Sequence, residues 1–130
     1  MDTSAWYPAV VSAHPEHRRV ATTLADRVRA KYRVVTTNLV VAETHALLLH
    51  RVHREAALRF VITVRQTPNV VVSSDSELEE RAITKWLAKY TDQSFSLCDA
   101  LSFAVMTSRR IDEALTLDKH FLAAGFRAVP

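Results

Sequence analysis

Apolar positions along the chain alternate between helical spacing and short β-branched runs. Val20, Leu24 and Val28 recur every four residues and predict a helix over 15–31. The β-branched run at 32–36 predicts a short strand. The same two signals continue to the end of the chain. They predict helices over 38–51, 54–66, 76–90, 97–109 and 119–124, and strands over 70–73, 113–117 and 126–129.

Local signals set the ends of several elements. Asn38 is expected to cap the 38–51 helix, and Ser76–Glu79 is typical of a capping box. Ser96 is expected to cap the helix that follows it, and Gly125 to stop the short helix before it. The 38–51 helix is apolar nearly all round, so we expect it to be buried.

Strands that alternate with helices predict an α/β fold with a parallel sheet covered on both faces. The chain has 130 residues, of which 48% are hydrophobic, and this suits one domain over 1–130 with a substantial core. No internal repeat, low-complexity segment or linker interrupts the pattern.

Composition excludes several classes of protein. The chain has one glycine, so neither a dinucleotide-binding GxGxxG nor a Walker A loop can be written. Cys98 is the single cysteine, which rules out an internal disulfide and favours a reducing cytoplasm. No apolar run approaches the roughly 20 residues that a bilayer crossing needs, and the first residues do not resemble a signal peptide.

Acidic residues interrupt apolar stretches or stand where a strand leads into a helix. These are Asp2, Glu43, Asp99 and Asp118. An ionised carboxylate in apolar surroundings is costly unless it is compensated, so four of them suggest a shared divalent cation with oxygen ligands. Asp2 and Asp118 would lie at the carboxyl ends of strands, where open α/β sheets bind ligands.

Each acid also has a purely structural interpretation. Asp2 and Asp118 could serve as N-caps. Asp99 lies three residues after Ser96 and could complete a capping box. Glu43 stands inside a helix, where no capping role exists, and its alternative is a buried ion pair with an arginine.

Charge indicates the kind of substrate. The chain carries 17 basic and 14 acidic residues, for a net charge of +3. If four acids surround a metal, 17 basic residues face the remaining 10 acidic ones, a balance of +7. An acidic pocket in a basic surface suits a polyanion, and one or two Mg²⁺ or Mn²⁺ ions suit phosphodiester hydrolysis.

Four short segments, taken in order, resemble the motifs of PIN-domain ribonucleases, and in particular of the VapC toxins of bacterial toxin–antitoxin pairs. They are Asp2–Trp6, Thr37–Glu43, Ser96–Ala100 and Thr116–Phe121, the last followed by Gly125-Phe126. Each segment is weak alone, but their order and spacing extend over essentially the whole chain.

The resemblance implies a PIN-like three-layer α/β/α fold with a short, mostly parallel central sheet. It implies a Mg²⁺- or Mn²⁺-dependent endoribonuclease that acts on structured RNA such as tRNA. Expected partners are a cognate small antitoxin and a second copy of the chain, with the two-fold contact at 38–51 and 54–66.

The resemblance also assigns roles to particular side chains. The expected metal ligands are Asp2, Glu43, Asp99 and Asp118. Ser4 and Thr116 would be hydroxyls that orient the carboxylates, and Asp92 is a weaker fifth acid that a solvated loop position also explains. A departure from the family lies at the start, where Met1 alone precedes Asp2 and an apolar strand is usual. Either the first strand is nearly missing or translation begins further upstream.

Two other functions remain open at this point. A PIN-like module could bind RNA or protein without cutting, and a receiver domain could use Asp75 as a phosphoacceptor. Cleavage of RNA that depends on Mg²⁺ or Mn²⁺ discriminates both from a nuclease.

Other residues favour structural interpretations. His50 and His53 have a spacing that could serve zinc, but flanking arginines favour a solvated or RNA-facing patch. Cys98 is expected to be a core thiol. Trp6 and Tyr7 are expected to pack against helices or an antitoxin.

Overall fold

The computed structural model describes all residues, Met1–Pro130, as helices that alternate with short strands. The elements are α1 Thr3–Val10, α2 His17–Arg29, β1 Val34–Thr37, α3 Asn38–Arg51, α4 Arg54–Thr63, β2 Asn69–Val72, α5 Ser76–Ala82, the π-helical turn η1 Ile83–Leu87, α6 Leu97–Ser108, β3 Glu113–Leu115, α7 His120–Ala123 and β4 Arg127–Val129. Each helix and strand expected from the sequence is present, with its ends moved by a few residues. A π-helical turn continues α5 where one regular helix was expected.

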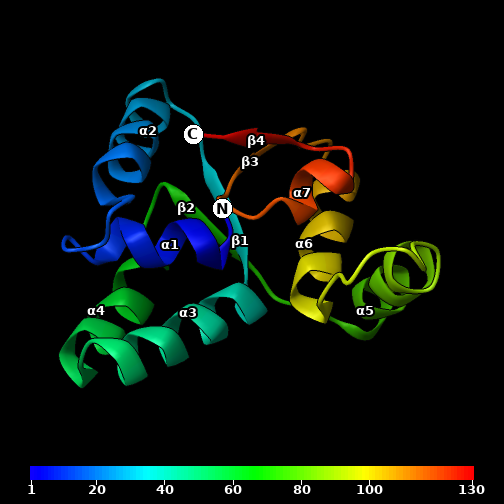
Figure 1. Ribbon diagram of the computed structural model, residues 1–130, viewed down its shortest axis with the longest axis horizontal. Helices are drawn as coiled ribbons and strands as arrows, with labels where there is room; N and C mark the ends of the chain where they lie inside the picture. The colour runs from blue at the N-terminus through cyan, green and yellow to red at the C-terminus, as the bar shows by residue number, and fades with distance from the viewer.

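The strands form two separate parallel pairs. β1 pairs with β2 from Val34 opposite Asn69 onward, and β3 pairs with β4 over three residues. The parallel arrangement is confirmed, but one continuous central sheet does not form. Met1 N donates to Val35 O of β1 and Asp2 N donates to Leu115 O of β3, and Figure 1 shows the N-terminus between the two pairs of strands.

Helices cover both sides of the strands (Figure 1). Helices α1 to α4 gather on one side of β1 and β2, and α5 to α7 lie on the other side. A core cluster that includes Trp6, Leu48 and Phe60 packs α1, α3 and α4 together. A second cluster around Phe103 and Phe121 packs α6 against α7 and β3. Burial of these apolar faces holds α1, α3 and α4 together on one side of the strands, and α6 and α7 together on the other side.

Two expectations about α3 are wrong. The helix is not buried all round, because it turns Val40, Thr44 and Leu48 inward and leaves Leu49 42% exposed. Its N-cap is Thr37, whose hydroxyl accepts from Val40 N at 3.2 Å, rather than the expected Asn38. The extended backbone that ends β1 puts the preceding residue in the capping position.

The start of α5 also differs from expectation. The N-cap is Asp75, which accepts from Leu78 N at 2.8 Å, so Ser76 does not begin a capping box. The expected stop at Gly125 is confirmed, since this glycine has φ +92° and follows Ala124, the C-cap of α7. No helix combines the length and apolar composition that a membrane crossing needs.

Candidate metal centre

Asp99 is positioned by the N-terminus of α6. Ser96 caps the helix by accepting from Asp99 N at 3.0 Å, and Asp99 Oδ2 accepts in return from Ser96 N at 2.9 Å. This is the capping box expected from the three-residue spacing. Asp99 is 7% exposed, and the positive end of the helix dipole favours its ionised carboxylate. Capping uses Oδ2, and Oδ1 accepts no hydrogen bond.

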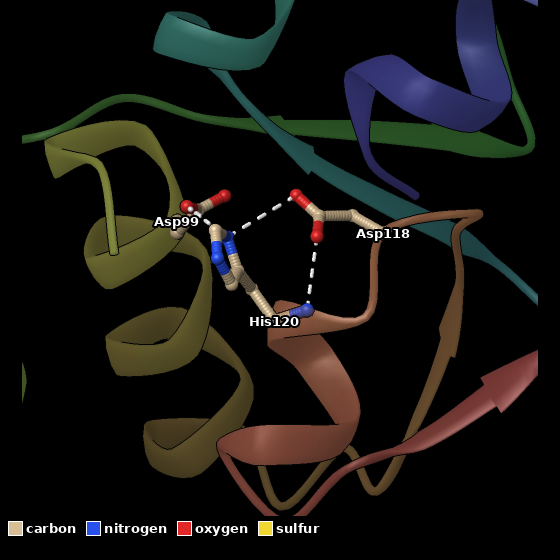
Figure 2. Close-up of side chains that lie close together, drawn as sticks. All are labelled: Asp99, Asp118 and His120. Atoms are coloured by element: carbon tan, nitrogen blue, oxygen red, sulfur yellow. Dashed lines mark hydrogen bonds and ion pairs between the residues drawn. The ribbon is translucent and has the colours of Figure 1, made fainter. Parts of the chain in front are cut away.

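Asp118 and His120 meet Asp99 from the turn between β3 and α7. Asp118 Oδ1 accepts from the backbone N–H of His120 at 2.9 Å. The imidazole then turns inward, so that Nδ1 lies 3.4 Å from Asp99 Oδ2 and 3.5 Å from Asp118 Oδ2 (Figure 2). Phe95 contacts the ring edge-to-face at 5.5 Å between centroids and limits its rotation.

Asp2 is held by hydroxyl groups. Its Oδ2 accepts from Ser4 Oγ at 2.7 Å, from Ser4 N at 3.0 Å and from Thr116 Oγ1 at 3.2 Å. Thr116 Oγ1 also accepts from Asp118 N at 3.0 Å, and this links the two acids. Asp2 Oδ1 makes no hydrogen bond and is available to a ligand. Burial lowers the pKa of the neighbouring Met1 amino group to about 6, against the opposing effect of Asp2.

Glu43 lies near the other acids on the side of Cys98. The Cys98 thiol is half-buried. Desolvation raises the pKa of this thiol, and the charges of Glu43, Asp2 and Asp99 raise it further. Cys98 packs against the core cluster that includes Trp6, as expected of a core thiol, and it also lies near these acids. One expectation is corrected: Glu43 is exposed on α3 rather than set among apolar side chains.

Of the four expected acids, the structure brings Asp99 and Asp118 together with His120. Asp2 is linked to Asp118 through Thr116, and Glu43 lies near Cys98. Asp99 is shared, since it lies beside both Cys98 and His120. Asp92 is not part of this group, because it is exposed in the loop before α6 and contacts Gln93 at 3.4 Å. His50 and His53 are exposed too, and His53 caps α4 by accepting from Ala56 N.

His120 is the residue that sequence reasoning missed. It stands two positions after Asp118, at the first residue of α7, where a side chain can turn back toward the preceding strand end. That spacing was visible in the sequence. The packing against Phe95 that aims the ring at Asp99 was not.

These side chains fit a metal ion. The Asp99, Asp118 and His120 ligand atoms all lie within 4.8 Å of one another. Nδ1 of His120 is buried, faces both carboxylates and makes no hydrogen bond, so it can serve as a ligand atom. Adjacent ligands of an octahedral ion at about 2.1 Å stand roughly 3 Å apart. The separations of 3.4 and 3.5 Å need to shrink only slightly to reach that arrangement.

Comparison with known proteins defines the class. The family model of the PIN domain matches residues 1–127, and the chain belongs to this family. PIN domains are metal-dependent nucleases. The resemblance drawn from the four segments is thereby confirmed.

The relatives narrow the class to VapC proteins. The chain is 38% identical over 93 residues to the 23S rRNA-specific endonuclease VapC20 of two Mycobacterium tuberculosis strains, covering 72% of this chain and 70% of each relative. A crystal structure of M. tuberculosis VapC20, described as a sarcin–ricin loop cleaving toxin, superposes with a TM-score of 0.85 at 32% identity. That comparison covers 99% of this chain and 97% of the other.

The hydroxyl of Thr116 can be tested by a substitution of nearly the same shape. Thr116→Val removes a donor to Asp2 and the acceptor of Asp118 N, so it should lower the free energy of unfolding by about 1–3 kcal/mol. Thr44→Val is the matched control, because Thr44 is equally buried but its hydroxyl has no partner. Urea denaturation measures both, and equal losses would contradict the role given to Thr116.

Proposed function

We propose that this chain is a metal-dependent endoribonuclease and the toxin of a toxin–antitoxin pair. The observation that carries the proposal is the convergence of Asp99, Asp118 and His120, with a buried imidazole nitrogen that faces both carboxylates but makes no hydrogen bond. Asp2 and Glu43 adjoin this group through Thr116 and Cys98. The similarity to VapC20 supports the same conclusion.

The proposed ligands are Asp2, Glu43, Asp99 and Asp118, with His120 as a nitrogen donor that the sequence did not indicate. One or two Mg²⁺ or Mn²⁺ ions bound there would supply an activated water and offset the charge that develops on the scissile phosphate. Ser4 and Thr116 hold the Asp2 carboxylate, and the backbone N–H of Ser96 holds that of Asp99. The ligands are thus oriented before an ion binds.

A hollow beside Asp118 offers a path for the substrate backbone. Its volume is about 420 Å³, and Arg19 and Lys119 contribute to its lining. Arginine and lysine next to an acidic centre favour phosphate groups on either side of the cleaved bond. Arg19 is held by Glu16 at 2.7 Å, so its guanidinium is already oriented at the rim.

Ribosomal RNA is the substrate class that we propose. The VapC20 relatives are named for cleavage of 23S rRNA, and one structure is described as cleaving the sarcin–ricin loop. The tRNA expected from the sequence therefore becomes the comparison substrate. Both are structured RNAs whose loops expose unstacked bases.

Two protein partners belong to the proposal. An antitoxin with a cationic segment would neutralise the acids, most simply through an arginine that forks onto two carboxylates. Trp6 does not offer it a surface, because the ring is buried against Phe60 at 5.6 Å. A second copy of the chain would cover α3 and α4, which expose Leu49, Val52, Leu58 and Ile62.

The alternatives are weaker. A receiver domain requires Asp75 as an acceptor, but Asp75 is committed to capping α5. A binding module without catalysis would not need acids that converge on a buried imidazole nitrogen. RNA cleavage in the presence and absence of EDTA separates this module from a nuclease.

Asp99→Asn should lower RNA cleavage by at least about a hundredfold with Mn²⁺ or Mg²⁺ present, because a neutral amide replaces an anionic ligand. The fold should persist, since the amide oxygen can still accept from Ser96 N. Asp92→Asn is the matched control and should cleave normally. Labelled 23S rRNA fragments and tRNA serve as substrates. Normal cleavage by a folded Asp99→Asn variant would sink the assignment.

His120 should set the choice of metal. A nitrogen ligand favours first-row transition ions over Mg²⁺, which prefers oxygen. In His120→Asn an amide oxygen can stand near the place of Nδ1, so Mg²⁺ affinity should be kept while the preference for Mn²⁺ falls about tenfold. Titration calorimetry with each ion measures the ratio, and His50→Asn is the exposed control. An unchanged ratio would remove His120 from the ligand set.

Toxicity should follow the same carboxylates. Induced expression of the chain should arrest bacterial growth, whereas the Asp99→Asn variant should not, because arrest requires cleavage. Co-expression of the small protein encoded beside the chain should restore growth and block cleavage in vitro. A harmless wild-type chain that still cuts RNA would refute the toxin role and leave the nuclease role standing.

A further inference from the structure

Basic residues gather at the end of the molecule where the strands begin. They come from the last turn of α2, the residues just before β1, the end of α6 and the first residue of β4, and they are Arg27, Lys31, Arg33, Arg109, Arg110 and Arg127. Arg27 is half-buried and the other five are exposed. Arg29 is not counted, because it pairs with Asp26 at 3.0 Å. We call the six residues the basic end.

Contacts between distant segments hold the basic end together. Glu113, the first residue of β3, pairs with Arg27 at 2.7 Å and with Arg127 at 2.9 Å. Arg27 also lies over the ring of Tyr32 at 5.8 Å, and Arg127 N donates to Asp112 O at 2.9 Å. The two loops that carry the other four basic residues therefore lie close to Glu113.

The basic end carries more positive charge than its surroundings neutralise. Only Arg27 and Arg127 pair with an acid, and they share Glu113. Asp112 is the other acid in these segments. The C-terminal ends of α2 and α6 add a partial negative charge of about −0.5 each, so six positive charges face roughly three negative ones. A surplus of this size at one end of a small domain attracts a polyanion.

The basic end lies at the opposite edge of the strands from the acids. Asp99 stands in the first turn of α6 and Arg109 is its C-cap, which places them roughly 15 Å apart at about 1.5 Å per residue. Helix α2 connects the two regions along the surface. Arg19 lines the hollow beside Asp118, and Arg27 follows roughly 12 Å further along the same helix. An RNA backbone that leaves the hollow along α2 reaches the basic end within a few nucleotides.

We propose that the basic end is a second RNA-binding surface, which holds the phosphate backbone of the stem whose loop enters the acidic site. Five of its six residues are arginines, and the planar guanidinium matches phosphate better than an ammonium does. Double-stranded RNA is recognised mainly through its shape and its backbone, which suits a surface of unpaired cations. The proposal rests on the nuclease function proposed above and adds a requirement for a stem.

The test measures RNA binding by fluorescence anisotropy in EDTA, so that no cleavage occurs. Two hairpins share one loop, and they differ in having a long stem or a stem of a few base pairs. Replacing Arg33, Arg109 and Arg110 by alanine should weaken binding of the long hairpin about tenfold or more. The slope of log K against log salt should fall by about two to three, because each phosphate contact contributes about 0.9. Binding of the short hairpin should not change.

The matched control replaces three other exposed cations by alanine, namely Arg81, Lys85 and Lys89 on α5 and η1 and just after them. It changes the net charge equally, away from the basic end, and should leave binding of both hairpins within about twofold of the wild type, since salt screens distant charges. With Mn²⁺ and saturating long hairpin, the basic-end variant should cleave at the wild-type kcat with a raised KM, because the acids are unchanged.

Three results would overturn the proposal. Equal weakening by the two triple variants would show that net charge alone matters. Equal weakening for the two hairpins would show that the stem is not contacted. Unchanged RNA binding by the basic-end variant would leave an acidic protein segment as the occupant of this surface.

Melting temperatures check that each variant folds. If the triple variant does not fold, Arg33→Ala alone should lower the salt slope by about one, and an unchanged slope would count against the proposal. A chain that binds the long stem through the basic end but cleaves no RNA with Mn²⁺ would support this surface and refute the nuclease. The two failures are therefore distinguishable.

Discussion

The hydrogen bonds to the Asp2 carboxylate determine how the site is assembled. Ser4 and Thr116 donate to the same oxygen, and Thr116 also accepts from the backbone of Asp118. Asp2 lies at the start of the chain and Asp118 near its end, so one ionised group aligns two distant segments. Bonds to a charged acceptor are about twice as strong as neutral ones, which suits a junction of this kind.

Carboxylates that lie close together repel one another, and the contacts around each carboxylate offset this repulsion. Asp99 stands at the N-terminus of α6, where the helix dipole and the Ser96 N–H favour negative charge. Burial, and after it the charges of Glu43, Asp2 and Asp99, raise the pKa of the Cys98 thiol, so the thiol is a poor nucleophile despite its central place. The ligands proposed for this site are accordingly oxygen and nitrogen donors rather than sulfur.

Local patterns made much of the structure predictable. The Ser96–Asp99 capping box and the stop at Gly125 follow from residue spacing, and so do the strand and helix positions. The contribution of His120 could not be predicted, because it depends on how α7 packs against Phe95. The exposure of Glu43 and the split sheet likewise depend on contacts between distant segments, which periodicity does not encode.

The site lies at the seam between two strand pairs that no common strand joins. Glu43 belongs to the helix that follows β1, whereas Asp118 follows β3, and Asp2 lies between them. An ion held by all three would link the two halves, and an ion that binds the folded state alone stabilises it by mass action. Such an ion would therefore couple the two pairs of strands through Asp2, whose position it would fix together with those of Glu43 and Asp118.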